Sequence, residues 1–328
     1  MKTNLKKISL LLAMMLIVVG LAACANDTKG NGDLVENPPV KDIAGDEEVD
    51  TGFPLEVEDA FGNIVVIEKA PERIISLAPS HTEILYALGL GEKVVGATAY
   101  CDYPEEALSV ERIGDFNGIN LEKIIELEPD LIVNYGPGSD EENNMYKSAG
   151  IPVIAYLPES IDEVIETIKQ IAIATDSVEE GNTLTNDMME KRDEIVGKVQ
   201  DTDSVKVFYE IWHEPLMAAG AGSFTDGLIV LANGVNVASD AEGEYPNYDL
   251  EQLIENDPEY YLTANMESGG FSENTVESIS ARPGYEDMTA VKNGDIYLLD
   301  GNIISRPGPR IVEGLELIAR TLHPEVFE

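Results

Sequence analysis

The sequence predicts an α/β fold of two similar lobes with central parallel sheets, joined by a long helical bridge. The first observation behind this prediction is a repeat: residues 121–133 read LEKIIELEPDLIV, and residues 250–262 read LEQLIENDPEYYL. Each copy has apolar residues at its first, fourth and fifth positions, then an acidic-Pro-acidic step, then an apolar run. This pattern predicts a short helix, a break and a strand in each half. A chance match of common residue types is the alternative.

The second observation is a helical stretch between the two copies. Ser160 and Glu163 have the spacing of a capping box, and apolar residues then recur at helical spacing as far as Val199. So long a connection without a strand is unusual inside one lobe, so we expect a rigid bridge over residues 160–202, broken once around residues 175–181. The third observation is the length of 328 residues, which is sufficient for two lobes.

The N-terminus resembles a bacterial lipoprotein signal. Three lysines precede an uncharged run, and the sequence Leu-Ala-Ala then leads into Cys24. We expect residues 1–23 to be removed and Cys24 to carry a lipid that anchors the protein to the extracytoplasmic face of the cell membrane. Residues 24–52 are polar and contain Pro-Pro, which predicts a disordered tether. The alternative is a plain transmembrane helix over residues 8–25.

The predicted N-terminal lobe covers residues 53–159. It begins with a hairpin of residues 53–57 and 64–67, followed by a central strand at 74–78. Ser80 and Glu83 have capping-box spacing and predict a helix at 82–88. The later elements are expected at residues 94–97 (strand), 121–133 (the repeat), 142–149 (helix) and 151–156 (strand).

The predicted C-terminal lobe covers residues 203–328 and repeats this order. A strand is expected at 205–212, and Thr225 is expected to cap a helix that Gly234 ends. The second repeat copy follows, with a strand at 296–299 and a final helix through Ala319.

Composition excludes several classes of protein. The formal net charge of −41 argues against binding to nucleic acid or to an anionic membrane face. Loss of Cys24 to lipid would leave Cys101 as the single free cysteine, so no intrachain disulfide is expected. Phosphate-loop, dinucleotide, zinc-protease and nucleophile-elbow motifs do not occur in the sequence. A Ser-His-Asp triad assembled in space, in a surface-anchored hydrolase, stays open as an alternative, and so does a purely structural adhesion protein.

Large aromatic residues follow the predicted strands. Because ligands bind beyond the carboxyl ends of parallel strands, aromatics gathered there would form a binding surface. The candidates are Tyr100, Phe116, Tyr135, Trp212 and Tyr245. The alternative for each is a place in the core.

Three stretches carry a resemblance to a known family. Residues 71–85 (PERIISLAPSHTEIL), 100–104 (YCDYP) and 120–122 (NLE) resemble the solute-binding proteins of cobalamin and iron-complex ABC importers. The resemblance runs from about residue 53 to the C-terminus, with the metal-complex-binding domain at about 72–328. It implies the helical-backbone receptor fold, no enzymatic activity and no intrinsic cofactor. It also implies a permease dimer with a cytoplasmic ATPase as partner, and a transported corrinoid as ligand, with haem or a ferric siderophore as the alternative.

The same resemblance implies the walls of a cleft between the lobes. It puts Tyr100, Phe116 and Tyr135 on one wall, and Trp212, Tyr245 and Arg306 on the other. The sequence departs from cobalamin-binding members of the family, where tryptophans are expected, at positions 116, 135, 245 and 303. His213 lies beside Trp212, either as a ligand to the metal of the bound complex or as an ordinary surface histidine.

The resemblance also gives the repeat a role. One glutamate on the outer surface of each lobe docks against arginines of the permease in this family, and the motifs place these at Glu122 and Glu251. Both are second residues of their repeat copies. The alternative is a solvated acid that is favourable at a helix start.

Overall fold

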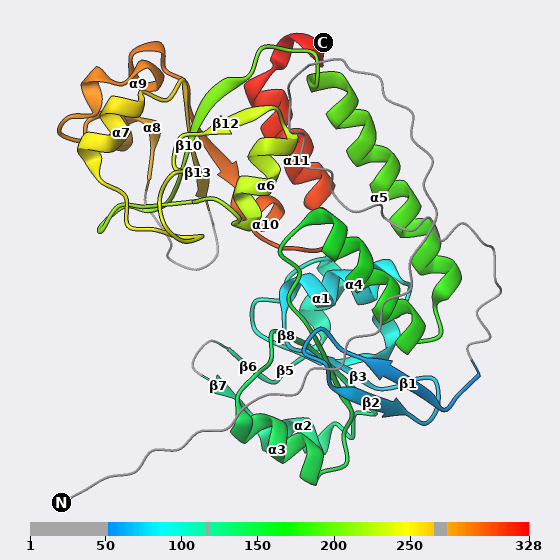
Figure 1. The fold of residues 1–328 in the computed structure, drawn as a ribbon. Coiled ribbons are helices and arrows are strands. Elements are labelled where there is room, and N and C mark those ends of the chain that lie inside the picture. Colours follow the sequence, from blue (N-terminus) through cyan, green and yellow to red (C-terminus); the bar gives the residue numbers. More distant parts are fainter. Residues whose placement is uncertain (1–51, 116–117, 266–273, 328) are drawn as a thin grey trace, which may run out of the picture. The chain divides into compact units, whose positions relative to one another are not determined.

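A computed structural model of the protein describes residues 52–115, 118–265 and 274–327 (Figure 1). The predicted signal peptide, Cys24 and the predicted tether up to residue 51 lie outside the described residues, and so does Phe116. The described helices include none that is long and apolar enough to cross a membrane.

The N-terminal lobe begins with the predicted antiparallel hairpin, formed by β1 (Leu55–Glu58) and β2 (Ile64–Ile67). A five-stranded sheet follows, in which all neighbouring strands are parallel. Its order is β5 (Glu111–Arg112), β4 (Val94–Ala97), β3 (Ile74–Ser76), β8 (Leu131–Tyr135) and β9 (Val153–Tyr156). The helices of this lobe are α1 (Pro79–Ala87), α2 (Leu121–Glu126) and α3 (Asp140–Ser148), and a short strand pair is formed by β6 (Gly114–Asp115) and β7 (Gly118–Ile119).

The C-terminal lobe contains a second sheet with a similar strand order. Strands β12 (Gly234–Asn236), β10 (Val205–Trp212), β13 (Tyr260–Asn265) and β14 (Ile296–Asp300) are parallel, and β11 (Met217–Ala218) runs antiparallel to the end of β10. The helices are α6 (Phe224–Leu231), α7 (Leu250–Asn256), α8 (Val276–Ser280), α9 (Thr289–Asn293), α10 (Gly301–Ile304) and α11 (Ile311–Leu322).

The repeat occupies corresponding places in the two sheets. In each copy a short helix, α2 or α7, precedes a strand, β8 or β13. Strand β8 pairs with β3, the first strand of its sheet, and β13 pairs with β10, the first strand of the other. The predicted order of helix, break and strand is therefore confirmed in both halves.

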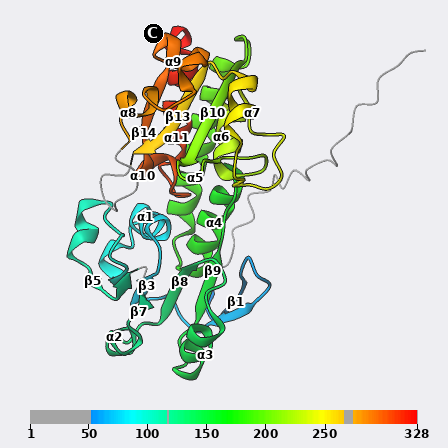
Figure 2. The same cartoon turned by 90° about the vertical axis from the view of Figure 1, so that its left-hand side faces the viewer.

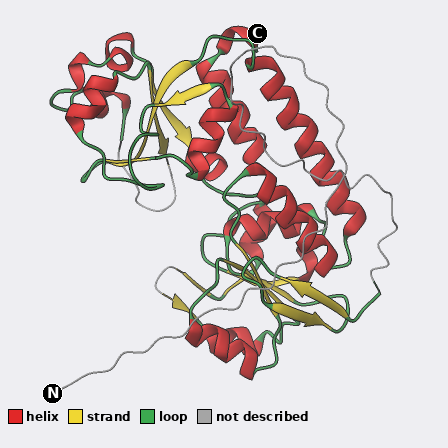
Figure 3. Ribbon diagram, viewed as in Figure 1, coloured by secondary structure: helices red, strands yellow, loops and turns green. Residues whose placement is uncertain are grey.

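Helices flank both sheets (Figure 3). Because side chains alternate across a strand, neighbouring residues enter different cores. In β10, Phe208 joins an apolar cluster with Leu253 of α7 and Ile279 of α8, whereas Val207 and Tyr209 join the main cluster. Buried faces on both sides explain why the sheet strands read as apolar runs rather than as alternating patterns.

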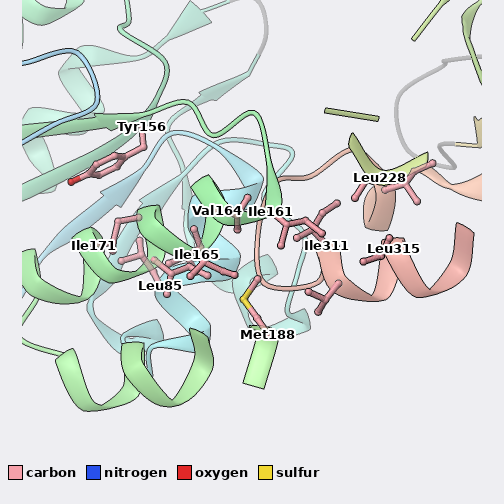
Figure 4. Close-up of a cluster of buried hydrophobic side chains, with 14 of the residues drawn as sticks. Leu85, Tyr156, Ile161, Val164, Ile165, Ile171, Met188, Leu228, Ile311 and Leu315 are labelled. Carbon is pink, nitrogen blue, oxygen red and sulfur yellow. The ribbon is translucent and has the colours of Figure 1, made fainter. Parts of the chain in front are cut away.

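The predicted bridge consists of α4 (Ile161–Ala174) and α5 (Val178–Val199), with the expected break at residues 175–177. Figures 1 and 2 show both helices running between the sheets, and α5 packs against α4 and α11. The main apolar cluster is continuous from Leu85 of α1, through Ile165 and Met188, to Ile311 and Leu315 of α11 (Figure 4). A core shared by both lobes and the bridge resists large hinge motions, because opening it would expose apolar surface.

Two local predictions about helix ends are wrong, and a third is confirmed in part. Helix α1 begins at Pro79 without a side-chain cap, and Glu83 reaches a distant partner instead of Ser80. Ser223 rather than Thr225 caps α6, which ends before Gly234, and Gly234 begins β12. The second predicted capping box is half formed: Ser160 accepts from the backbone N–H of Glu163, but the Glu163 carboxylate accepts from the N–H of Glu159.

Two glycines of α5 allow a test of the bridge. A methyl group on Gly181 would lie 2.5 Å from the Cβ of Ala172 in α4, whereas one on Gly197 would meet no atom within 4 Å. We expect Gly181→Ala to lower the free energy of unfolding by about 1–3 kcal/mol through overpacking. Gly197→Ala should raise it by roughly 0.5–1 kcal/mol through helix propensity. Urea denaturation measures both, and equal effects of the two substitutions would contradict close packing of α4 against α5.

Candidate functional site at the facing edges of the two sheets

Tyr135 is the last residue of β8 and is 39% exposed. The ring of His81, in the first turn of α1 after β3, meets the Tyr135 ring edge-on at a centroid distance of 5.7 Å. Tyr156, the last residue of β9, stacks with His81 at a centroid distance of 6.5 Å. Two strand ends and the first turn of α1 therefore supply an aromatic group at one edge of the N-terminal sheet.

His81 is a buried, neutral member of this group. Burial lowers the pKa of His81 to about 3, so the imidazole carries no charge at neutral pH. Its Nδ1 lies 3.5 Å from the Ser80 hydroxyl, and its Nε2 has no hydrogen-bond partner among the described residues. Since His81 has no hydrogen bond or ion pair with a carboxylate in the described part of the chain, Ser80 and His81 do not form the triad of a hydrolase.

The corresponding edge of the C-terminal sheet borders a cavity of about 560 Å³. Trp212 ends β10, is 40% exposed, and donates its indole N–H to the Glu214 carbonyl at 2.8 Å. His213 is half-buried, and its Nε2 lies 3.6 Å from a Glu214 carboxylate oxygen. Its Nδ1 is buried and has no hydrogen-bond partner in the described ranges. Tyr209 and Ser305 also line the cavity.

Tyr245 is a further partly exposed aromatic residue of the C-terminal lobe. It lies in the loop before Pro246, is 46% exposed, and has a pKa raised by burial and by the carboxylates Glu244 and Glu159. Burial also raises the pKa of Tyr135, with smaller contributions from Tyr245 and Glu159. Tyr135 and Tyr245, one from each lobe, are therefore both partly exposed tyrosines that stay neutral at physiological pH. Tyr135 and Trp212 thus each end a strand of a parallel sheet and are partly exposed, as is Tyr245 in its loop, and their role in ligand binding stays a prediction.

A buried charge network lies beneath the cavity, and it was not predicted. The carboxylate of Glu210, in β10, accepts from the guanidinium of Arg282 and from the hydroxyl of Tyr261. The amide N–H of Asn274 donates to the Glu210 carboxylate at 3.0 Å, and the amide oxygen of Asn274 accepts from the Arg282 guanidinium at 2.8 Å. Burial alone would lower the pKa of Arg282, but Glu210 outweighs it and the pKa is raised. The sequence does contain an indication of this network: Glu210 is the one acidic residue in an otherwise largely apolar strand, and a buried carboxylate needs a cation nearby.

The Arg306 side chain forms hydrogen bonds and ion pairs that link the two lobes. Its Nη1 donates to Asp102 at 2.6 Å and approaches Glu83 at 3.4 Å, and its Nη2 donates to Asn302 at 2.7 Å. Arg310 makes a bidentate pair with Glu83, at 2.6 and 2.9 Å, and its guanidinium stacks on the Tyr103 ring at 3.7 Å. Burial favours a raised pKa of Asp102, but Arg306 reverses this and holds it below the usual value.

The remaining candidates are placed as follows. Tyr100 is partly buried in the loop that follows β4. Phe116 and Cys24 lie outside the described residues. Glu122 and Glu251 are exposed, each in the first turn of its repeat helix. Neither carboxylate has an ion pair or hydrogen bond with any other described residue, while the backbone caps are supplied by Asn120 and Asp249.

Comparison with known proteins places this geometry in a family. The model of the periplasmic binding protein family matches residues 74–303. An ABC transporter substrate-binding lipoprotein of Bacillus subtilis (strain 168) is 31% identical over 98% of this chain and 99% of its own length.

Two solved structures share both fold and sequence similarity. The periplasmic vitamin B12 binding protein of Vibrio cholerae has a TM-score of 0.67 and 28% identity, over 78% of this chain and 98% of that one. A periplasmic heme-binding protein from Roseiflexus has a TM-score of 0.70 and 27% identity, over 78% and 99% of the two chains. This chain therefore belongs to the periplasmic binding protein family, whose two-lobed members are the non-enzymatic substrate-binding components of ABC transporters.

Proposed function

We propose that this protein captures a metal-containing macrocycle or chelate in the cleft between its lobes and delivers it to an ABC permease. The observation that carries this proposal is the arrangement of Tyr135, Trp212 and Tyr245, three partly exposed aromatics that come from both lobes. Flat apolar surfaces with polar tips suit the face of a large planar ring. Tyr100 and Phe116 are proposed to extend the N-terminal wall.

A corrinoid, with cobalamin first, is the proposed ligand. The similarity to the vitamin B12 binding protein of Vibrio cholerae supports this choice. Haem or a ferric siderophore is the second candidate, supported by the similarly strong match to the heme-binding protein of Roseiflexus. His213 is proposed as a ligand to the metal of the bound complex, because its half-buried side chain lines the cavity and an imidazole nitrogen can bind cobalt or iron.

The cellular location of the protein is inferred from the sequence that resembles a lipoprotein signal. We infer that Cys24 carries the lipid and holds the folded body at the extracytoplasmic face of the membrane. The Bacillus relative is named a lipoprotein, which supports this inference. Glu122 and Glu251 are then proposed to dock on the permease dimer, whose ATPase drives release. The continuous core of the bridge favours a small closure of the lobes on ligand binding.

Titration of the purified protein tests this function. Trp212 is the only tryptophan in the chain, so quenching of its emission by a bound metal complex reports directly on the cleft. Cyanocobalamin, haemin and a ferric trihydroxamate should be compared at equal concentrations. We expect the tightest binding with cyanocobalamin, and Tyr135→Ala or Tyr245→Ala should each weaken it by about tenfold.

Tyr297→Ala is the matched control for these variants. Tyr297 is also a partly exposed tyrosine, but it lies near the start of β14, away from the carboxyl edge of its sheet. The Tyr297→Ala substitution should leave the affinity for cyanocobalamin unchanged. Absence of quenching and of spectral change with every corrinoid would overturn the choice of ligand, and absence with all three classes would overturn the function.

A further inference from the structure

The facing edges of the two sheets are lined with exposed carboxylates. Glu159 is exposed three residues beyond the end of β9, whose last residue, Tyr156, pairs in register with Tyr135. Its carboxylate has no bonded partner in the described part of the chain, since only its backbone N–H is used, by Glu163. On the opposite lobe, Glu214 lines the cavity with a side chain that is 87% exposed. Glu244 is exposed beside Tyr245.

The nearby arginines do not offset these carboxylates. Arg306 and Arg310 are engaged by Glu83 and Asp102, with distances down to 2.6 Å. Arg282 is held beneath the cavity by Glu210. The positive charge of each of these guanidinium groups is already paired with a buried or half-buried carboxylate. The charged side chains that remain exposed near the site are therefore the carboxylates Glu159, Glu214 and Glu244, while Trp212 and His213 also line the cavity.

We propose that the cleft selects metal complexes whose outer groups are neutral or cationic, and rejects complexes that carry carboxylate or catecholate charge. This inference rests on the proposed function and narrows its ligand class. A complex bound between Tyr135 and Trp212 brings its rim to Glu159 and Glu214, where like charges repel in a partly desolvated site. A ring rimmed by amides, or a ferric hydroxamate, can instead donate N–H groups or present positive charge there.

Two corrins of the same shape but different side-chain charge can test whether the charge of the ligand affects binding. Cobyrinic acid heptaamide and free cobyrinic acid, both with two cyanides on cobalt, share ring, metal and axial ligands but differ in seven side-chain amides against seven carboxylates. Trp212 quenching at physiological ionic strength measures both affinities. We expect the heptaamide to bind at least about tenfold more tightly. A cationic ferric trihydroxamate and an anionic ferric catecholate form a second pair with the same expectation.

Two double variants locate the effect. Glu159→Gln with Glu214→Gln removes two charges at the site and should reduce the amide-to-carboxylate preference by about tenfold. Glu179→Gln with Glu190→Gln removes two exposed charges from α5, in the bridge, and should leave the preference unchanged.

The possible failures are distinguishable. Equal affinity for the amide and carboxylate corrins would overturn the charge inference while leaving the proposed function intact. An equal loss of preference in both double variants would also overturn it, because the overall charge of −41 rather than the cleft would then be the cause. Failure of all four metal complexes to bind would overturn the proposed function and this inference together.

Discussion

Replacing Glu122 and Glu251 together by alanine should abolish delivery of ligand to the permease while leaving affinity in the cleft unchanged. Both carboxylates are exposed, lack partners among the described residues, and sit at equivalent places in the two lobes. A dimeric permease would present one basic site to each. Loss of one member of a charge pair at an interface costs roughly 2–5 kcal/mol, so each single variant should already reduce delivery by more than tenfold.

The measurement is uptake of labelled cyanocobalamin by cells that carry the variant as their only copy of the protein. The matched control is Glu141→Ala with Glu277→Ala, which removes exposed first-turn glutamates from α3 and α8, again one per lobe. This control should transport normally. Full transport by the Glu122/Glu251 variant, at normal protein abundance, would refute docking through these residues.

Replacing Glu83 by alanine should produce the largest loss of stability. Its side chain is only 2% exposed and holds Arg310 in a bidentate pair and Arg306 in a second contact. Burial alone would lower the pKa of Arg310, but the hydrogen bond and charge of Glu83 raise it, so the guanidinium stays charged. Removing the carboxylate leaves that charge buried without compensation, at a cost of about 3–5 kcal/mol in the free energy of unfolding.

Chemical denaturation should be compared with Glu72→Ala. Glu72 pairs with Lys93 at the surface, with a side chain that is 63% exposed, so its loss should cost less than about 1 kcal/mol. Adding Arg310→Met to Glu83→Ala should recover part of the stability, because it removes the uncompensated charge. A loss below 1 kcal/mol for Glu83→Ala would show that the pair contributes little between the lobes.

The regular elements could be predicted because each produces a local pattern. Residues 94–97 and 205–212 match β4 and β10, and the bridge has its break where the apolar spacing changes. Helix ends were less well predicted. Ser80 and Glu83 have capping-box spacing, but the Glu83 side chain gains more from Arg310 than from a backbone N–H.

The candidate site was predicted in part. Tyr135 and Trp212 end β8 and β10, where the carboxyl ends of parallel strands place side chains at one edge of a sheet, whereas the loop position of Tyr245 has no such reason and the binding role of all three stays a prediction. Arg306 was expected on a wall of the cleft, yet its guanidinium is used by Asp102, Glu83 and Asn302. The contact of His81 with Tyr135 was missed, since a single histidine in the first turn of a helix has no periodic signal that points to its partner.

The sequence by itself determined the two lobes, the helical bridge and the repeated unit that carries Glu122 and Glu251. These features follow from spacing along the chain, which fixes which side chains share a face of a helix or a strand. The tertiary structure alone decided the charge pairs. Glu83 and Arg310 are 227 residues apart, and Glu210 and Arg282 are 72 apart, so no local spacing marks either pair. A buried acid must pair with a cation wherever the fold supplies one, and that partner can lie anywhere along the chain.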